Sequence, residues 1–149
     1  MHVKATIKGK ALASQVQIPV RAWQDLGNRM RLRIIMRTRG RGVDADGAPF
    51  EPYSPGYAKT KAKRGGMIGG GRVNLTGVTA GPKMLDDIAV LQVSATNNPR
   101  LILGFATAGK ATIARYHMGE GRVDREFFAL SDDDMDDAHS YLRAQIART

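Results

Sequence analysis

Residues 87–107 read DIAVLQVSATNNPRLILGFAT, which is two apolar runs separated by a short polar segment. The residues at 97–99 are Asn, Asn and Pro, all of which favour turns. An apolar run, a turn and a second apolar run are typical of a β-hairpin, so we predict that residues 88–95 pair with residues 100–106. Since the segments on either side have helical periodicity, the hairpin predicts an α+β fold, with a small antiparallel sheet packed against two to three helices.

The strongest helical pattern precedes the hairpin. Apolar residues recur every three or four positions from residue 21 to residue 37, which predicts an amphipathic helix. The residues on its apolar face are Trp23, Leu26, Met30 and Ile34. Arginines recur at a spacing of four on another face, at positions 29, 33 and 37. Like charges at this spacing repel by a few tenths of a kcal/mol per pair, so the arginine ridge predicts either an anionic partner or solvation by water and salt.

Further strand and helix signals lie towards the two ends of the chain. Residues 3–7 alternate between apolar and polar, as a half-buried strand does. Residues 110–118 are predicted to form a helix that ends at Gly119. The last helix begins after Ser131, a favoured N-cap residue, and has aspartates at 132–134, where the positive end of the helix dipole stabilises them. These signals support one domain over residues 1–149.

Charge is distributed unevenly along the chain. The net charge is +9, with 15 Lys and Arg against 4 Asp and Glu in residues 1–72 (+11) and 8 against 10 in residues 73–149 (−2). Such asymmetry favours either a polyanionic partner or self-association through unlike surfaces. The chain contains no cysteine, which excludes disulfides, thiol catalysis and zinc–thiolate sites. It also contains no apolar run of the roughly 20 residues that cross a membrane.

Residues 38–72 show no periodicity and are rich in Gly, Pro, Lys and Arg. A structureless segment of this length in a compact domain is usually functional or disordered. We therefore predict a long, mobile basic loop that is too polar to bury, interrupted by an ordered turn at PFEPYSPGYAK, residues 49–59.

Catalytic and metal-binding chemistry find little support. His117 and the run SDDDMDD do not have the spacing of a calcium loop, and capping of the last helix already explains three of the aspartates. GGMIGGGR, residues 65–72, matches neither phosphate-binding glycine motif. No serine lies in a nucleophile elbow. We therefore predict no catalytic residue, no metal site, no cofactor and no enzymatic activity.

Three stretches in order resemble a known family. They are PFEPYSPGYAKTKAK at 49–63, NLTG followed by MLDDIAV within 74–90, and ARYHMGEGR followed by REFFALS within 114–131. In this order they resemble the virion morphogenesis or tail completion proteins of tailed bacteriophages. The resemblance covers the chain from about Phe50 to the C-terminus. The sequence departs from the family pattern at 78–83, VTAGPK, which separates Leu-Thr-Gly from Met-Leu.

The resemblance implies a non-enzymatic subunit that joins the DNA-filled head to the tail. Its expected partners are other copies of itself in a six-fold or twelve-fold ring, neighbouring neck, connector or tail-tube proteins, and packaged DNA passing through the lumen. No membrane partner is expected. The expected location is the neck or tail of the virion, and the host cytoplasm during assembly. The rival interpretation is a basic module that binds nucleic acid without sequence specificity.

Two groups of residues are predicted to make these contacts. Those predicted at subunit or ring contacts are Tyr116, His117, Arg125, Phe127, Phe128, Lys61, Lys63 and Arg64. Those predicted to contact DNA in the lumen or phosphate are Arg39, Arg41, Lys59 and Arg72. Because successive side chains of an extended segment point to opposite sides, we expect one phenylalanine of the Phe127–Phe128 pair in the core and the other on a neighbour.

Overall fold

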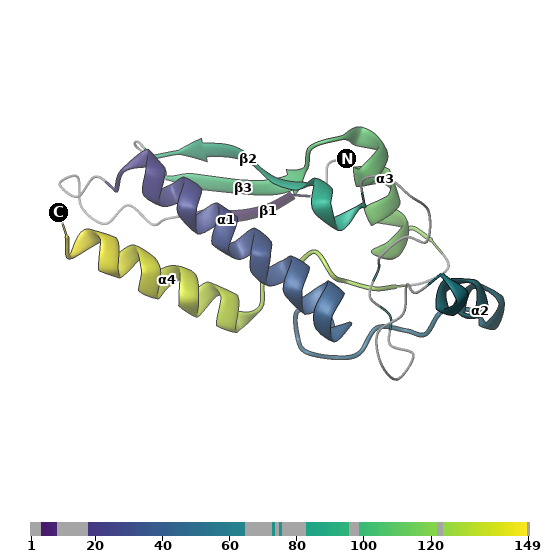
Figure 1. Cartoon of the computed structure of the whole chain (residues 1–149). Coiled ribbons are helices and arrows are strands. Elements are labelled where there is room, and N and C mark those ends of the chain that lie inside the picture. The colour runs from purple at the N-terminus through teal and green to yellow at the C-terminus, as the bar shows by residue number, and fades with distance from the viewer. Residues whose placement is uncertain are drawn as a thin grey trace.

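The computed structural model places the following residues, to which all structural statements below refer: 4–8, 18–64, 73, 75, 83–95, 99–121 and 124–148. In chain order the elements are strand β1 (Lys4–Lys8), helix α1 (Val20–Met36), a π-helical turn η1 (Arg37–Arg41), helix α2 (Pro55–Lys63), a short 3₁₀ turn η3 (Leu85–Asp87), strands β2 (Ile88–Ser94) and β3 (Arg100–Phe105), and helices α3 (Ala108–His117) and α4 (Asp132–Ile146). Figure 1 shows α1 lying between the sheet and α4, with α2 projecting at one end. The fold is α+β, as predicted.

The sheet confirms the predicted hairpin. Strands β2 and β3 pair antiparallel, and β1 pairs antiparallel with the other edge of β3, which gives the order β1-β3-β2. Residues 101–105 of the central strand are all buried, which explains why this run is apolar without alternation. The β2–β3 register shifts between Val90 and Gln92, so Leu91 stands in a β-bulge and is 43% exposed at the edge of the sheet.

Helix α1 begins and ends within one residue of the predicted bounds. Its four predicted apolar residues are at most 1% exposed and form the centre of the core. Gly27 lies where α1 approaches the sheet most closely, since a Cβ there would meet Val90 Cγ2 at 2.6 Å and Leu101 Cδ1 at 2.9 Å. The missing side chain at Gly27 therefore sets the distance between the helix and the sheet.

The expectation of a structureless loop from residue 38 is wrong as far as residue 64. The turn η1 continues α1 and ends at Gly42, whose positive φ of 67° favours glycine. The expected ordered turn at 49–59 leads into helix α2, which begins at Pro55, in the first turn, where the missing N–H costs nothing. Periodicity did not reveal α2 because it has only nine residues and faces the body with a lysine. Residues 65–72 lie outside the described residues, and the predicted mobility stays a prediction.

Helices α3 and α4 lie where the sequence predicts them. Gly119 ends α3 with a φ of 97°. Ser131 is the N-cap of α4: its Oγ accepts a hydrogen bond from Asp134 N at 3.1 Å, and its own N–H donates to Asp134 Oδ2 at 3.0 Å. This reciprocal pair is a capping box. It satisfies two backbone donors at the start of the helix.

Loss of the N-cap should measurably destabilise the fold. Ser131→Ala removes the Oγ acceptor, and we expect the free energy of unfolding to fall by about 1 kcal/mol, as for other lost N-caps. Urea denaturation followed by circular dichroism measures this. The control is Ser140→Ala, because Ser140 is exposed in the middle of the same helix. Equal stabilities of the two variants would contradict a capping role for Ser131.

Candidate functional site

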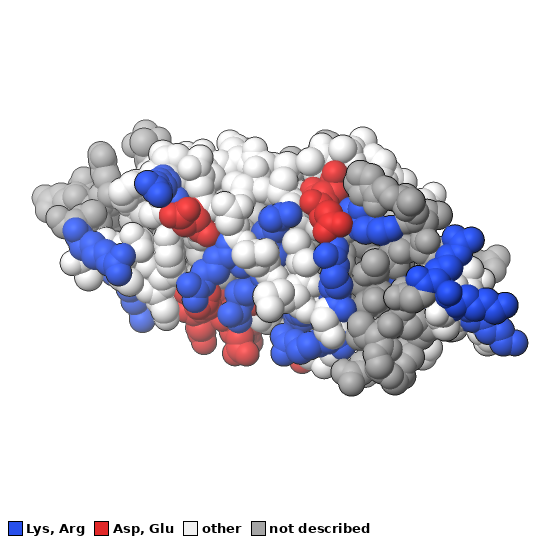
Figure 2. Space-filling view, viewed as in Figure 1, with Lys and Arg blue, Asp and Glu red and all other residues white. Residues whose placement is uncertain are grey.

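The most prominent charged feature is the projecting helix α2. Lys59, Lys63 and Arg64 are exposed on it, and α2 contains no acidic residue. Figure 2 shows the Lys and Arg side chains gathered at this end of the molecule. We call α2 together with Arg64 the basic arm. Three residues predicted as contacts, one of them to DNA, therefore share an exposed surface.

Lys61 lies on the opposite side of the basic arm and is fully buried. Its Nζ donates a hydrogen bond to the Tyr53 hydroxyl at 2.6 Å and lies 4.3 Å from the centroid of that ring. Burial and the nearby Arg125 lower the pKa of Lys61 to about 8. The prediction that this segment is too polar to bury is wrong at Lys61, because a phenol hydroxyl and an aromatic face solvate the ammonium in place of water.

Arg125 also contacts Tyr53. Its guanidinium lies 5.0 Å from the centroid of the Tyr53 ring, and it donates from Nε to Glu51 O at 2.9 Å and from Nη2 to Pro52 O at 3.2 Å. Its Nη1 lies 3.4 Å from His117 Nδ1, so this geometry makes Nδ1 the acceptor. Burial, Arg125 and Lys61 together hold the pKa of His117 below its usual value.

These contacts bring together three side chains that the sequence predicted separately, Lys61, His117 and Arg125, around one that it did not, Tyr53. We call these four residues the cationic anchor. All 14 Asp and Glu of the chain fall within the described residues, and none of them forms an ion pair with the anchor there. The anchor is therefore a cluster of two buried cationic side chains, Lys61 and Arg125, and two half-buried rings, His117 and Tyr53, without a carboxylate.

The arginine ridge of α1 has a partner inside the same chain. Arg29 pairs with Asp137, and Arg33 and Arg37 both pair with Asp134. Of the two alternatives left open by the sequence, the anionic partner is therefore correct, and it is α4. Burial alone would raise the pKa of Asp134, but hydrogen bonds from Arg33, Ser131 and Arg37 hold it below its ordinary value.

The internal pairs leave a different set of acids exposed on α4. Asp132, Asp133 and Asp136 are exposed; the geometry of an α-helix places Asp132 and Asp136 on the side away from Asp134, whereas Asp133 neighbours Asp137. None of the three forms an ion pair with another described residue. The molecule thus carries an acidic helix face on α4 and a basic one on α2.

The expectation for the phenylalanine pair is wrong. Phe127 and Phe128 are 0% and 5% exposed, and both pack on Phe105, with ring centroids 6.3 and 5.1 Å away. The extended-segment argument fails because the backbone turns here: Phe127 N donates to Arg125 O at 2.7 Å, which closes a three-residue turn. Neither phenylalanine is available to a neighbouring subunit.

The remaining residues predicted as contacts differ in their exposure to solvent. Tyr116 is 58% exposed and can touch a partner. Arg41 is also exposed, whereas Arg39 pairs with Asp86 at the surface. Arg72 lies outside the described residues. Lys61 and Arg125, at 0% and 4% exposure, cannot be direct surface contacts in this conformation.

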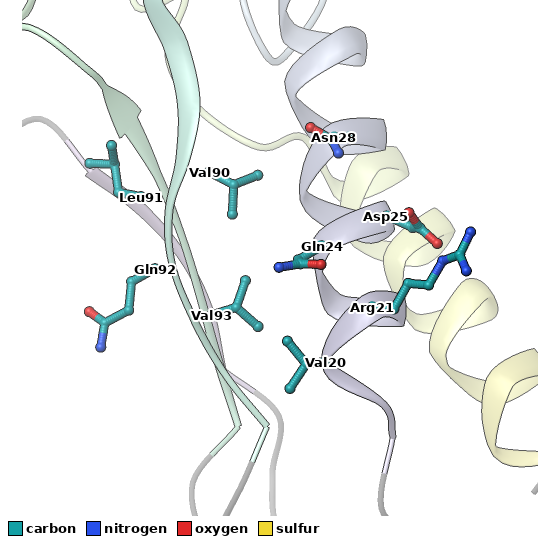
Figure 3. A pocket seen from close by; sticks show the side chains of 9 residues that line it. All are labelled: Val20, Arg21, Gln24, Asp25, Asn28, Val90, Leu91, Gln92 and Val93. Atoms are coloured by element: carbon teal, nitrogen blue, oxygen red, sulfur yellow. The ribbon is translucent and has the colours of Figure 1, made fainter.

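A shallow groove of about 680 Å³ lies between the start of α1 and strand β2. Figure 3 shows its apolar side chains, Val20, Val90, Leu91 and Val93, among polar ones from both elements. Asp25 is the one carboxylate in the lining, and no histidine is present. This lining lacks the pair of titratable groups that general acid–base catalysis uses.

Within the residues that the structure describes, no group of three or more His, Asp or Glu side chains is placed to hold a metal ion. No helix there has the length and apolar character needed to cross a bilayer. Comparison of the chain with family models, curated proteins and solved structures finds no match.

Proposed function

We propose that this protein is a structural virion protein of the head–tail junction, where copies join into a ring and contact neighbouring neck, connector or tail-tube proteins. The resemblance of residues 50–149 to tail completion proteins suggests this role. The observation that supports it most directly is the pair of exposed helix faces of opposite charge, on the basic arm and on α4. A closed ring needs two different, complementary surfaces on each subunit.

Geometry also supports the pairing of these two faces between copies. Lys59 and Lys63 are four residues apart, so they lie on one face of α2, and Asp132 and Asp136 have the same spacing on α4. The basic arm projects from one end of the molecule, whereas α4 runs along α1 (Figure 1). The two faces thus lie on separate parts of the surface, as a head-to-tail contact requires.

Binding of nucleic acid without sequence specificity is the second candidate. The absence of acidic residues from α2 favours nucleic-acid binding, because neighbouring Lys and Arg side chains can each neutralise a phosphate. The acidic face of α4 opposes it, since that face repels a polyanion. DNA passing through the ring remains compatible with the first proposal.

Charge exchange tests the first proposal. Lys59→Glu/Lys63→Glu and Asp132→Lys/Asp136→Lys each place like charges on both faces, and in both variants the two positions are four residues apart on one helix face. Each variant alone should self-associate about tenfold more weakly than the wild type, given up to about 1 kcal/mol per exposed pair. An equimolar mixture should recover association, because opposite charges then face each other at every contact. Sedimentation and cross-linking at low salt measure this.

The matched control reverses two exposed charges outside both faces, Arg21→Glu at the start of α1 and Arg148→Glu beyond the end of α4, and should leave association unchanged. Failure of the mixture to recover association would contradict the contact between the two faces. If Lys59→Glu/Lys63→Glu instead abolishes steeply salt-dependent binding of duplex DNA by a monomeric wild type, the second candidate is favoured.

A further inference from the structure

The attachment of the basic arm to the body depends on very few side chains. Lys61 is the one buried residue of α2, and α2 makes no extensive contact with another helix or strand of the described residues. Tyr57 also contacts the body, with its ring centroid 5.0 Å from that of Tyr53. An element held by so few buried contacts has a low free energy of local opening.

The charges around this attachment are all of one sign. Lys61 reaches from α2 and Arg125 from the segment before α4, and both contact Tyr53, while His117 at the end of α3 contacts Arg125. The nearest acids in sequence are Glu51, Glu120, Asp124 and Glu126, all of which are exposed. Glu120 pairs with Arg115, and none of the four forms an ion pair with the anchor in the described structure. If His117 takes up a proton, its positive charge therefore adds to those of Lys61 and Arg125, and no carboxylate in the described structure pairs with it.

We propose that the cationic anchor is an acid-sensitive latch, which holds the basic arm against the body at neutral and alkaline pH and releases it when His117 is protonated. Protonation removes the Nδ1 acceptor that faces Arg125 Nη1 and adds a third positive charge to a buried site. Release of the arm carries Lys61 away and exposes the imidazolium to water. The latch does not depend on the joining function and can be studied in the isolated subunit.

The direction of the pH effect follows from the two shifted groups. The pKa of His117 lies below 6.5 in the docked state, so docking weakens as the pH falls below 6.5. The pKa of Lys61 is about 8 when docked against 10.5 for a free lysine, so docking strengthens as the pH rises from about 8 to 10.5. His117 and Lys61 both bind fewer protons when the arm is docked than when it is released. Raising the pH therefore favours docking in two separate steps.

Release should precede acid unfolding. The ion pairs between α1 and α4 depend on Asp134 and Asp137, and the pKa values of both lie below 3.8. These pairs therefore persist at pH 5, which lies below 6.5 and hence in the range where release of the arm is expected. The arm can detach while the core remains folded.

The absence of cysteine allows a direct measurement of the arm. Spin labels on Lys63→Cys and Thr112→Cys, both exposed, report the distance between α2 and α3 by electron–electron dipolar spectroscopy. We expect one distance at neutral pH and a second, longer distance that grows as the pH falls below 6.5. Within each step the ratio of docked to released arm should change by up to about tenfold per pH unit. Circular dichroism at each pH confirms that the rest of the protein is folded.

Two variants show which residue causes each of the two pH-dependent steps. His117→Gln should lose the lower step and keep the upper one, while Lys61→Met should lose the upper step. If His117→Gln does not fold, NMR titration of His117 in the wild-type protein replaces it, and the imidazole midpoint must coincide with the change in distance. A distance distribution that is constant from pH 4.5 to pH 9, or a lower step that survives in His117→Gln, would overturn the proposal.

Discussion

Asp134→Ala should lower the free energy of unfolding by about 3–5 kcal/mol, because it removes one partner of a buried ion pair and leaves the other without compensation. Asp134 is 2% exposed and accepts hydrogen bonds from both Arg33 and Arg37. The Arg37 side chain is 5% exposed, so its charge has no access to water once the carboxylate is gone. The substitution also removes the acceptor of the Ser131 N–H, one of the two hydrogen bonds of the capping box, which accounts for about 1 kcal/mol of the loss.

Urea denaturation of Asp134→Ala and of Asp136→Ala measures the effect. Asp136 is an exposed acid on the same helix, so its loss should change stability by less than about 0.5 kcal/mol. The pKa of Asp134 is held below 3.8 in the folded protein. Its ionised form therefore stabilises the fold above that pH, and this contribution is lost as the pH falls through the folded-state pKa. The difference between wild type and Asp134→Ala should shrink over the same range, and a difference independent of pH would contradict the ion-pair explanation.

Phe127→Ala should cost about 3–5 kcal/mol, the range for removal of a buried aromatic side chain from a core. Phe127 is fully buried, and its ring lies edge-on to those of Phe105 and Phe128. Substitution with alanine removes both aromatic contacts and leaves a cavity beneath strand β3. Because this cluster connects the sheet to the segment before α4, the loss should appear as a lower midpoint of a single cooperative transition.

Tyr116→Ala is the matched control for Phe127→Ala. Tyr116 is 58% exposed, so its removal should leave the stability of the subunit within about 0.5 kcal/mol of the wild type. The two positions belong to the same stretch of sequence, and the sequence predicted both as subunit contacts. A Phe127→Ala variant as stable as Tyr116→Ala would show that Phe127 does not belong to the core.

Much of the fold could be predicted because its signals are local. The hairpin is specified by two apolar runs and a turn, α1 by apolar residues at helical spacing, and the start of α4 by Ser131 and the aspartates after it. Helix α2 could not be found in this way. It is short, its first two residues are Pro55 and Gly56, and the buried side chain that holds it to the body is a lysine, which burial patterns assign to the surface.

The candidate site was predicted only in part. Lys61, His117 and Arg125 were singled out, but as exposed contacts on separate segments, and Tyr53 was not assigned a role in the site. Nothing in the sequence shows that Lys61 and Arg125 share the ring of Tyr53, or that Arg125 reaches His117, because these residues come from separate segments of the chain. A tight turn at Phe127, formed by backbone hydrogen bonding, likewise decides that both phenylalanines enter the core.

The sequence by itself determined the charge of each segment, the positions of the hairpin and of the amphipathic helices, and the cap of the last helix, because each depends on residues within a few positions of one another. Only the tertiary structure decided which charged side chains form ion pairs within the subunit and which remain exposed on its surface. Arg37 and Asp134 are 97 residues apart, and their pairing follows from α4 packing antiparallel on α1. That packing satisfies the inward-facing aspartates and leaves Asp132, Asp133 and Asp136 exposed, because a helix presents opposite faces to its core and to water.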